Sequence, residues 1–311
     1  DFAIYSVRER PAVCAPYRCF EACGMAPPSS GGVTVAQILG LLTPFDLAEL
    51  GSKSPQAWRL IGDASRLAFA DRGRYLADSD FVPVPVEGLL APEYLDSRSE
   101  LMRRDDALPE VAPGDPEFDH ALEHGDGRSP ERPATSHVSI VDRYGNALSM
   151  TASIENGFGS RLMVRGFLLN NQLTDFSFAS HSDGRPVANA VAPGKRPRSS
   201  MAPTILRRGG QPVLVLGSPG GSRIIGYVAK TIIAWADWGL DPQQAVSLPH
   251  LVNRYGPYDL EPGTGDLADR LRGLGYDVSV TPQTSGLHVI ELGEELIGGA
   301  DPRREGLACG E

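Results

Sequence analysis

The chain has 311 residues, enough for one large domain or two ordinary ones with a sizeable core. It carries 29 Lys and Arg against 39 Asp and Glu, which gives a formal net charge of −10. This acidic balance argues against nucleic acid or an anionic membrane surface as the main partner. No apolar run is long enough to span a bilayer.

The N-terminal end and the cysteines say little about the compartment. Asp1 opens the chain, without the charged and apolar regions of a signal peptide. We therefore expect a leader or a larger N-terminal portion to precede it, and we favour a periplasmic or secreted location over a cytoplasmic one. Cys14, Cys19 and Cys23 are followed by no second ligand pair. Structural or incidental thiols are thus favoured over a metal site, and we predict no metal or cofactor.

The first hundred residues predict a loop region followed by helices. Residues 1–32 are expected to be extended or loop structure, ending in a tight turn where two prolines precede two glycines. Apolar residues at helical spacing predict helices near 33–42 and 55–71, and a shorter helix near 92–103. At the end of the second helix, Asp71 and Arg72 are expected to form either an ion-pair network or an exposed cap.

A composition shift separates these helices from the rest of the chain. Residues 103–134 carry nine acidic residues, four arginines and five prolines, with few apolar side chains. This composition predicts a mobile, solvated linker. An ordinary interdomain linker would have the same composition, but it would not explain the Thr-Ser-His that follows directly.

Thr135 stands between this linker and a predicted β-hairpin. The hairpin spans about 136–154, with a turn at 143–146 between the alternating apolar residues Val138, Ile140, Leu148 and Met150. A Thr hydroxyl is a weak nucleophile unless a base lies beside it. Cleavage just before the Thr makes its own α-amine that base. We therefore predict self-cleavage of the Ala134–Thr135 bond and a catalytic role for Thr135.

The remaining elements favour an α+β fold built around antiparallel sheets. The pattern predicts a strand over 166–176, with polar residues at its end that line a pocket, and then a polar loop over 177–198. Further strands are expected at 204–208, 212–216, 278–281, 288–292 and 296–299, and helices at 224–238, 242–248 and 266–274.

A glycine-rich turn at 217–223 joins one of these strands to a long helix. Such a turn presents backbone N–H groups at a helix N-terminus, which suits an anion or an oxyanion. It lacks the Lys and the spacing of a phosphate loop, so nucleotide binding is not expected.

Four motifs follow one another along the chain. They are Thr135-Ser136-His137, Leu168-Leu169-Asn170-Asn171-Gln172 with Asp175-Phe176, the run from Pro193 to Thr204, and Gly217-Ser218-Pro219-Gly220-Gly221-Ser222-Arg223. Together and in this order, they resemble the γ-glutamyltransferase (γ-glutamyltranspeptidase) family of N-terminal nucleophile hydrolases. The resemblance covers nearly the whole chain. It implies a four-layer αββα fold and a proenzyme cut into two subunits that stay together. Residues 1–134 would be the C-terminal part of the large subunit, and 135–311 the small catalytic subunit.

The resemblance also implies roles for the catalytic residues. Thr135 would be the nucleophile, with its freed amine as base. Ser153 occupies a position where the family usually has a Thr that hydrogen-bonds the nucleophile. The backbone N–H groups of Gly220 and Gly221 would form the oxyanion hole. Because the amine already serves as base, we expect His137 to have a structural role in the strand.

The same resemblance divides the substrate site into two halves. Glu155, Gln172 and Asp175 would bind the α-ammonium of a γ-glutamyl group, while Ser199 and Ser200 would hydrogen-bond its α-carboxylate. The residue types agree, because acids and an amide oxygen suit an ammonium and hydroxyls suit a carboxylate. The family's carboxylate-binding Arg belongs to a part of the large subunit that this sequence does not include.

The expected reaction is cleavage of glutathione-like γ-glutamyl amides through a γ-glutamyl-Thr135 ester. The acyl group would pass to water, an amino acid or a peptide. A related cephalosporin or glutaryl amide acylase is the first alternative, although an acyl chain without an ammonium would leave Glu155 and Asp175 unpaired. A family member that does not mature and lacks activity is the second.

Overall fold

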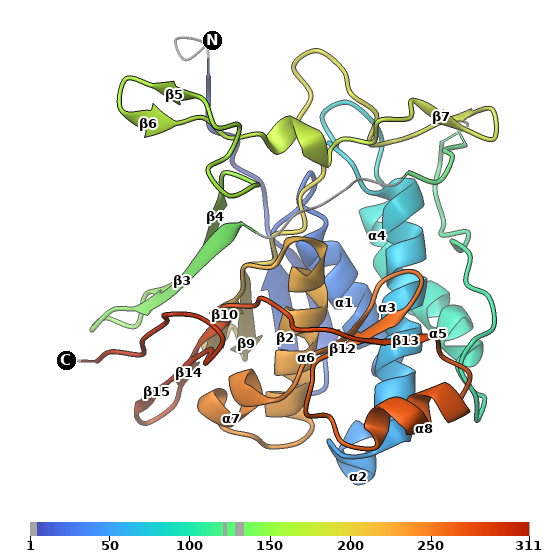
Figure 1. The fold of residues 1–311 in the computed structure, drawn as a ribbon, viewed down its shortest axis with the longest axis vertical. Helices are drawn as coiled ribbons and strands as arrows, with labels where there is room; N and C mark the ends of the chain where they lie inside the picture. The colour runs from blue at the N-terminus through green and yellow to red at the C-terminus, as the bar shows by residue number, and fades with distance from the viewer. Residues whose placement is uncertain (1–4, 121–122, 128–133, 311) are drawn as a thin grey trace.

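The computed structural model describes residues 5–120, 123–127 and 134–310. Its main sheet has six antiparallel strands in the order β1-β2-β9-β10-β14-β15 (Figure 1). These strands are β1 (Val13–Tyr17), β2 (Phe20–Gly24), β9 (Thr204–Arg208), β10 (Gln211–Gly217), β14 (His288–Leu292) and β15 (Leu296–Ala300). Because β2 pairs with β9, segments on both sides of Thr135 build one sheet.

Helices cover one face of this sheet. The helices α1 (Gly31–Leu42) and α6 (Ile224–Ala236) pack against it, and α3 (Pro55–Tyr75) packs on α1. Their apolar side chains form the main core with the strands. The side chain of Ser54 caps α3, and Pro55 takes the first helical position, where no backbone donor is needed.

The smaller elements surround this core. A three-stranded sheet beside α3 contains β11 (Leu251–Asn253), β12 (Tyr258–Leu260) and β13 (Val278–Val280). The short helices are α2 (Leu47–Leu50), α4 (Val86–Leu90), α5 (Pro92–Glu100), α7 (Pro242–Ser247) and α8 (Leu267–Gly273). Within the described ranges, no helix is long and apolar enough to cross a membrane.

The predicted hairpin packs on the other face of the main sheet. It consists of β3 (Thr135–Val141) and β4 (Ala147–Ser153), and it contacts β10 and β14 (Figure 1). Its inward side chains are polar: Ser149 donates to the carbonyl of Leu216 at 2.8 Å, and Ser139 donates to that of His288 at 3.2 Å. The apolar side chains of Ile140, Leu148 and Met150 point the other way and are 46–49% exposed.

The α+β class with stacked antiparallel sheets is therefore confirmed. Three of the four expected layers are present in the described part of the chain: helices, the six-stranded sheet and the hairpin β3–β4. No helix within those residues covers the outer face of the hairpin, so the second helical layer of an αββα fold is not seen there.

Several predicted elements need correction. The region 1–32 contains β1 and β2, whose alternation is too short to be distinctive without their partner β9. The strand predicted over 166–176 is only the two-residue β6 (Phe167–Leu168), paired with β5 (Met163–Val164), followed by the 3₁₀ helix η2 (Gln172–Asp175). The loop 177–198 holds a small hairpin, β7 (His181–Ser182) and β8 (Arg185–Pro186), and β11 and β12 were not predicted.

Much of the described part of the predicted linker is exposed, as expected, but it is anchored on its neighbours at several points. Ala107 and Leu108 are buried, and the Ala107 N–H donates to the carbonyl of Leu274 at 2.8 Å. The Gly127 N–H donates to the carbonyl of Gly73 at 3.0 Å. Few apolar residues suffice here because backbone hydrogen bonds hold the segment on its neighbours. Residues 121–122 and 128–133 lie outside the described part, so their expected mobility stays a prediction.

Two of the four cysteines have the structural role that the sequence analysis favoured. Cys14 and Cys23 face each other across β1 and β2 and form a disulfide. Cys19 and Cys309 are exposed free thiols.

Candidate active site

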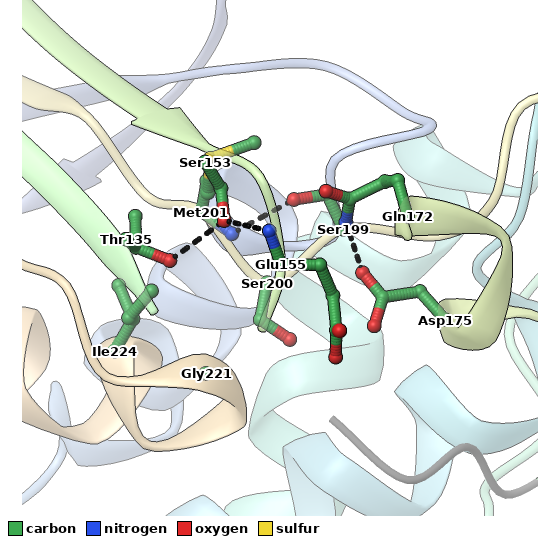
Figure 2. Close-up of a pocket in the computed structure, with 10 residues that line it drawn as sticks. All are labelled: Thr135, Ser153, Glu155, Gln172, Asp175, Ser199, Ser200, Met201, Gly221 and Ile224. Atoms are coloured by element: carbon green, nitrogen blue, oxygen red, sulfur yellow. Dashed lines mark hydrogen bonds between the residues drawn. The ribbon is translucent and has the colours of Figure 1, made fainter. Parts of the chain in front are cut away.

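One small pocket gathers eight of the nine side chains and backbone groups assigned to the site from the sequence. Its walls come from the start of β3, the end of β4, η2, the segment before β9 and the start of α6 (Figure 2). The lining residues are Thr135, Ser153, Glu155, Gln172, Asp175, Ser199, Ser200, Met201, Gly221 and Ile224. The ninth, Gly220, directly precedes Gly221.

Thr135 and Ser153 face each other because they are directly paired across β3 and β4. The Thr135 hydroxyl donates to Ser153 Oγ at 3.1 Å, and Ser153 Oγ donates to the carbonyl oxygen of Ala134 at 3.0 Å. The Glu155 N–H donates to the same Ser153 oxygen at 2.9 Å, and Arg304 Nη1 donates to the Thr135 carbonyl at 3.0 Å. The bond before Thr135 is thus held in a defined hydrogen-bond chain.

The acidic half of the pocket is formed by Glu155 and Asp175, which are 3% and 5% exposed. The Asn171 side-chain amide donates to Glu155, and the Gln172 amide donates to Asp175. Since its N–H₂ group serves Asp175, the carbonyl oxygen of Gln172 is oriented as an acceptor. Two carboxylates and an amide oxygen suit a small cation.

The backbone of Glu155 is in the left-handed region, with φ of 72°. A non-glycine residue pays roughly 1–2 kcal/mol for this conformation. Its N–H bond to Ser153 Oγ holds the turn just after β4. This turn places the carboxylate in the pocket instead of letting the strand continue.

The opposite half is formed by the neighbouring Ser199 and Ser200. The Met201 N–H donates to Ser199 Oγ at 3.1 Å, and Arg72 Nη2 donates to Ser200 Oγ at 2.5 Å. A short parallel bridge to Ser29 fixes the segment in place. Hydroxyl groups in such a setting suit a carboxylate.

The glycine pair lies at the entry to α6. Gly220 has φ of 140° and Gly221 has φ of 60°, both in the region that favours glycine. A Cβ atom at Gly220 would lie 2.6 Å from Cε2 of Tyr227. The turn therefore needs a glycine for its conformation and for space.

His137 lies between the two sheets and not in the pocket. It is buried, with Nδ1 2.8 Å from Thr151 Oγ1 and Nε2 3.1 Å from Ser139 Oγ. Burial, with a smaller effect of His288, lowers the pKa of His137 to about 3. A neutral ring held on both sides agrees with a structural role.

Some described residues that contact the site were given no catalytic or binding role from the sequence. They include Ser30, Arg72, Asn171 and Arg304. Asn171 lies inside one of the quoted motifs, so a motif comparison alone could have found it. Asp71 and Arg72 are 1% and 2% exposed, which rules out the exposed cap. Asp71 instead contacts Gln37, Tyr94 and Arg98.

A Thr at the head of a strand, a hydroxyl on the preceding carbonyl and a glycine turn define a candidate N-terminal nucleophile hydrolase. The model of the gamma-glutamyltranspeptidase family matches residues 1–310. The chain belongs to this family.

Named relatives agree with this assignment. The chain is 34% identical to the glutathione hydrolase proenzyme of Bacillus subtilis, over 100% of this chain and 54% of the relative. It is 36% identical to that of Escherichia coli, over 97% and 53%. The acylase ACY 1 proenzyme of Pseudomonas sp. strain SE83 is 33% identical, over 92% and 49%. The chain thus spans about half the length of these relatives.

Solved structures give the same picture. The cephalosporin acylase of Bacillus halodurans matches with a TM-score of 0.84 over 98% of this chain and 54% of that one, at 24% identity, which supports the fold alone. A mutant of Helicobacter pylori gamma-glutamyltranspeptidase matches with a TM-score of 0.51 and 35% identity, over 54% of this chain and 99% of that one.

Proposed function

We propose that the protein cuts its own Ala134–Thr135 bond and then acts as a γ-glutamyl transferase and hydrolase. The observation that carries the proposal is the hydrogen-bond chain from Thr135 through Ser153 to the Ala134 carbonyl, beside an acidic subsite and a serine pair. The products of the cut would be 1–134, part of a large subunit, and 135–311, the small subunit.

The cleavage step uses groups already in contact. The Thr135 oxygen attacks the Ala134 carbonyl carbon and loses its proton to Ser153, which donates its own proton to the Ala134 oxygen. Collapse of this intermediate breaks the C–N bond, protonates the Thr135 amine and leaves an ester. Water then hydrolyses the ester. This releases the carboxyl group of Ala134 and leaves Thr135 with a free α-amine next to its hydroxyl.

The freed amine then serves as base for acyl transfer. Thr135 attacks the γ-carbonyl carbon of the substrate, and the amine moves the hydroxyl proton to the leaving nitrogen. The N–H groups of Gly220 and Gly221 stabilise the oxyanion, each contributing on the order of 3 kcal/mol. Water or an amino-acid amine attacks the resulting ester and regenerates Thr135.

The two halves of the pocket select the acyl group. An α-ammonium pairs with Glu155 and Asp175, and an α-carboxylate accepts from Ser199 and Ser200. We therefore propose glutathione and similar γ-glutamyl amides as donors. A related acylase acting on cephalosporin or glutaryl amides is the second candidate, since one relative, 33% identical, is named an acylase. A glutaryl chain carries no ammonium for the acidic half of the pocket.

Denaturing intact mass of the complete gene product tests the proposal, with Thr135→Ala as control. The expected result is two fragments, the second starting at Thr135, in the unmutated protein only. Turnover of γ-glutamyl-anilide is then expected to exceed turnover of glutaryl-anilide. A single uncut mass would contradict the maturation step, and a preference for glutaryl-anilide would favour the acylase.

A further inference from the structure

Ser218 is buried at the start of the glycine turn that joins β10 to α6. It directly follows the last residue of β10 and is 0% exposed. Its hydroxyl donates to the carbonyl oxygen of Pro219 at 2.7 Å, and its oxygen accepts from the N–H of Gly286 at 3.3 Å. The proton and the oxygen of this side chain therefore both bind the protein backbone.

The hydrogen bond to Pro219 fixes the orientation of the next peptide. In a trans peptide, the carbonyl oxygen and the N–H of the following residue point in opposite directions. The carbonyl of Pro219 points toward the Ser218 hydroxyl, so the N–H of Gly220 points away from it. Within the described residues, neither this N–H nor that of Gly221 donates to another protein group. Both donors are thus left for a group in the pocket, whose wall includes Gly221.

The glycine at position 220 makes such a restraint necessary. Its φ is 140°, and rotation of the Pro219–Gly220 peptide by half a turn would bring φ to negative values. Glycine adopts both signs of φ about equally well. The backbone alone does not choose between the two orientations, so the side chain that holds the Pro219 carbonyl decides where the N–H points.

The segment that contacts Ser218 is itself anchored. Gly286 packs closely on the turn, because a Cβ atom there would lie 2.7 Å from Cγ of Pro219. Its neighbours are tied to the carboxylate of Asp301, which is 2% exposed. The Leu287 N–H donates to Asp301 Oδ2 at 3.1 Å, and the Ser285 hydroxyl donates to the same oxygen. A buried carboxylate thus holds the Gly286 N–H in place.

We propose that Ser218 is a positioning residue for the oxyanion of acyl transfer. It fixes the Pro219–Gly220 peptide so that the Gly220 N–H points toward the oxygen that becomes negative when Thr135 attacks the substrate. This inference rests on the proposed γ-glutamyl activity. It does not concern self-cleavage, in which Ser153 is the proposed donor to the carbonyl oxygen.

Ser218→Ala in the complete gene product tests the inference. Intact mass is expected to show self-cleavage within a few-fold of the unmutated rate. On γ-glutamyl-anilide, kcat is expected to fall roughly 10- to 100-fold with KM changed less than about threefold. The loss falls on kcat because the positioned donor acts on a charge that exists only in the transition state.

Two ligands give a second measurement that does not depend on turnover. Glutamate resembles the ground state, whereas its analogue with a boronic acid in place of the γ-carboxyl group forms a tetrahedral anion with the Thr135 oxygen. In Ser218→Ala, calorimetry is expected to show weaker binding of the boronic acid, by roughly the same factor as kcat. The affinity for glutamate is expected to change less than about threefold.

Matched variants separate this role from a general loss of structure. Ser65→Ala removes another buried hydroxyl that donates to a backbone carbonyl, that of Asn253, outside the pocket, and is expected to leave kcat and KM unchanged. Ser218→Cys fills similar space with a weak donor, so it is expected to lose kcat much as Ser218→Ala does. Ser285→Ala loosens the anchor on Asp301 and is expected to give a smaller loss of kcat at the same KM. It also serves if the variants at 218 do not fold.

Three results would overturn the inference. They are full kcat in Ser218→Ala or Ser218→Cys, equal losses of affinity for glutamate and the boronic acid, and loss of self-cleavage together with turnover. Absence of γ-glutamyl-anilide turnover in the unmutated protein would instead overturn the proposed function, and the inference with it.

Discussion

Ser153 contacts the groups involved in both proposed reactions, self-cleavage and acyl transfer by Thr135. It accepts from Thr135 and donates to the Ala134 carbonyl oxygen, where negative charge would develop during the proposed cleavage. The family resemblance implies a Thr at this position. Since Ser and Thr both carry a hydroxyl, we expect the role to need the oxygen and not the methyl group.

Ser153→Ala is expected to slow self-cleavage roughly 100-fold or more, because one donor to the developing oxyanion is lost. Ser153→Thr is expected to stay within about tenfold of the unmutated rate. Intact mass over time after expression measures the cut fraction. Equal rates in the Ala and Thr variants would show that the hydroxyl is not needed.

The buried His137 is expected to make the free energy of unfolding depend on pH. Its pKa is about 3 in the folded protein and near the ordinary value of 6.5 in the unfolded chain. Between these values the unfolded chain binds more protons, so stability falls as the pH is lowered from 6.5 toward 3. The full effect is at most about 5 kcal/mol, since one pKa unit corresponds to about 1.4 kcal/mol.

His137→Asn is expected to lose less stability over the same pH range, because the buried imidazole is gone. Urea unfolding near pH 7 and near pH 4.5 measures both proteins, and the difference between them isolates this residue from the carboxylates. An unchanged pH dependence would assign the acid sensitivity to other groups.

At the scale of elements, the glycine turn before α6 is supported by a side chain of that same helix. The Tyr227 ring is buried against Gly220, and its hydroxyl donates to Gln283 Oε1 at 3.1 Å. The ring of His250 also packs against it, with centroids 4.1 Å apart. The ring therefore has little room to retreat from the turn.

Gly220→Ala is expected to lower kcat roughly 100-fold, because the new Cβ displaces the N–H groups assigned to the oxyanion. Gly210→Ala is the matched control: Gly210 has φ of 82° in an open hairpin turn, so its substitution adds strain without a clash. Steady-state kinetics gives kcat for both variants and shows whether the loss is specific to Gly220→Ala. Similar kcat values would show that the turn tolerates the displacement.

The limits of sequence reasoning are clearest for β3 and β4. The alternation predicted both strands, but it does not say which face is buried, because that depends on the partner sheet. The buried face is polar here since backbone carbonyls of the main sheet accept from Ser139 and Ser149. Likewise, β1 and β2 are too short to be recognised without β9, which lies almost 200 residues further along the chain.

The candidate site was easier to predict than the fold around it. Its side chains stand in short motifs, and these motifs converge in one pocket. The contact of Arg72 with Ser200 was not predictable, since the two residues are 128 positions apart and charges at helix ends are usually exposed. Contacts of this kind follow from packing and not from local pattern.

At the scale of the molecule, residues 1–134 and 135–311 are interleaved. They share the main sheet through β2 and β9, and α1 packs on α6. After the proposed cleavage the two fragments are expected to co-elute in gel filtration, also at about 1 M salt, because they share an apolar core and the backbone pairing of β2 with β9. Denaturant is expected to separate them. Two native peaks would contradict the shared core.

The shared sheet also has a consequence for the order of folding and the proposed cleavage. Before the cut, β2 and β9 belong to one chain, so they find each other at a rate independent of protein concentration. After the cut, fragments separated by denaturant must meet by diffusion, without the high effective concentration that a covalent tether provides. Refolding of the mature form would then slow on dilution, whereas refolding of Thr135→Ala would not. The proposed cleavage would therefore follow folding, and refolding after it would be less efficient than refolding of the uncut chain.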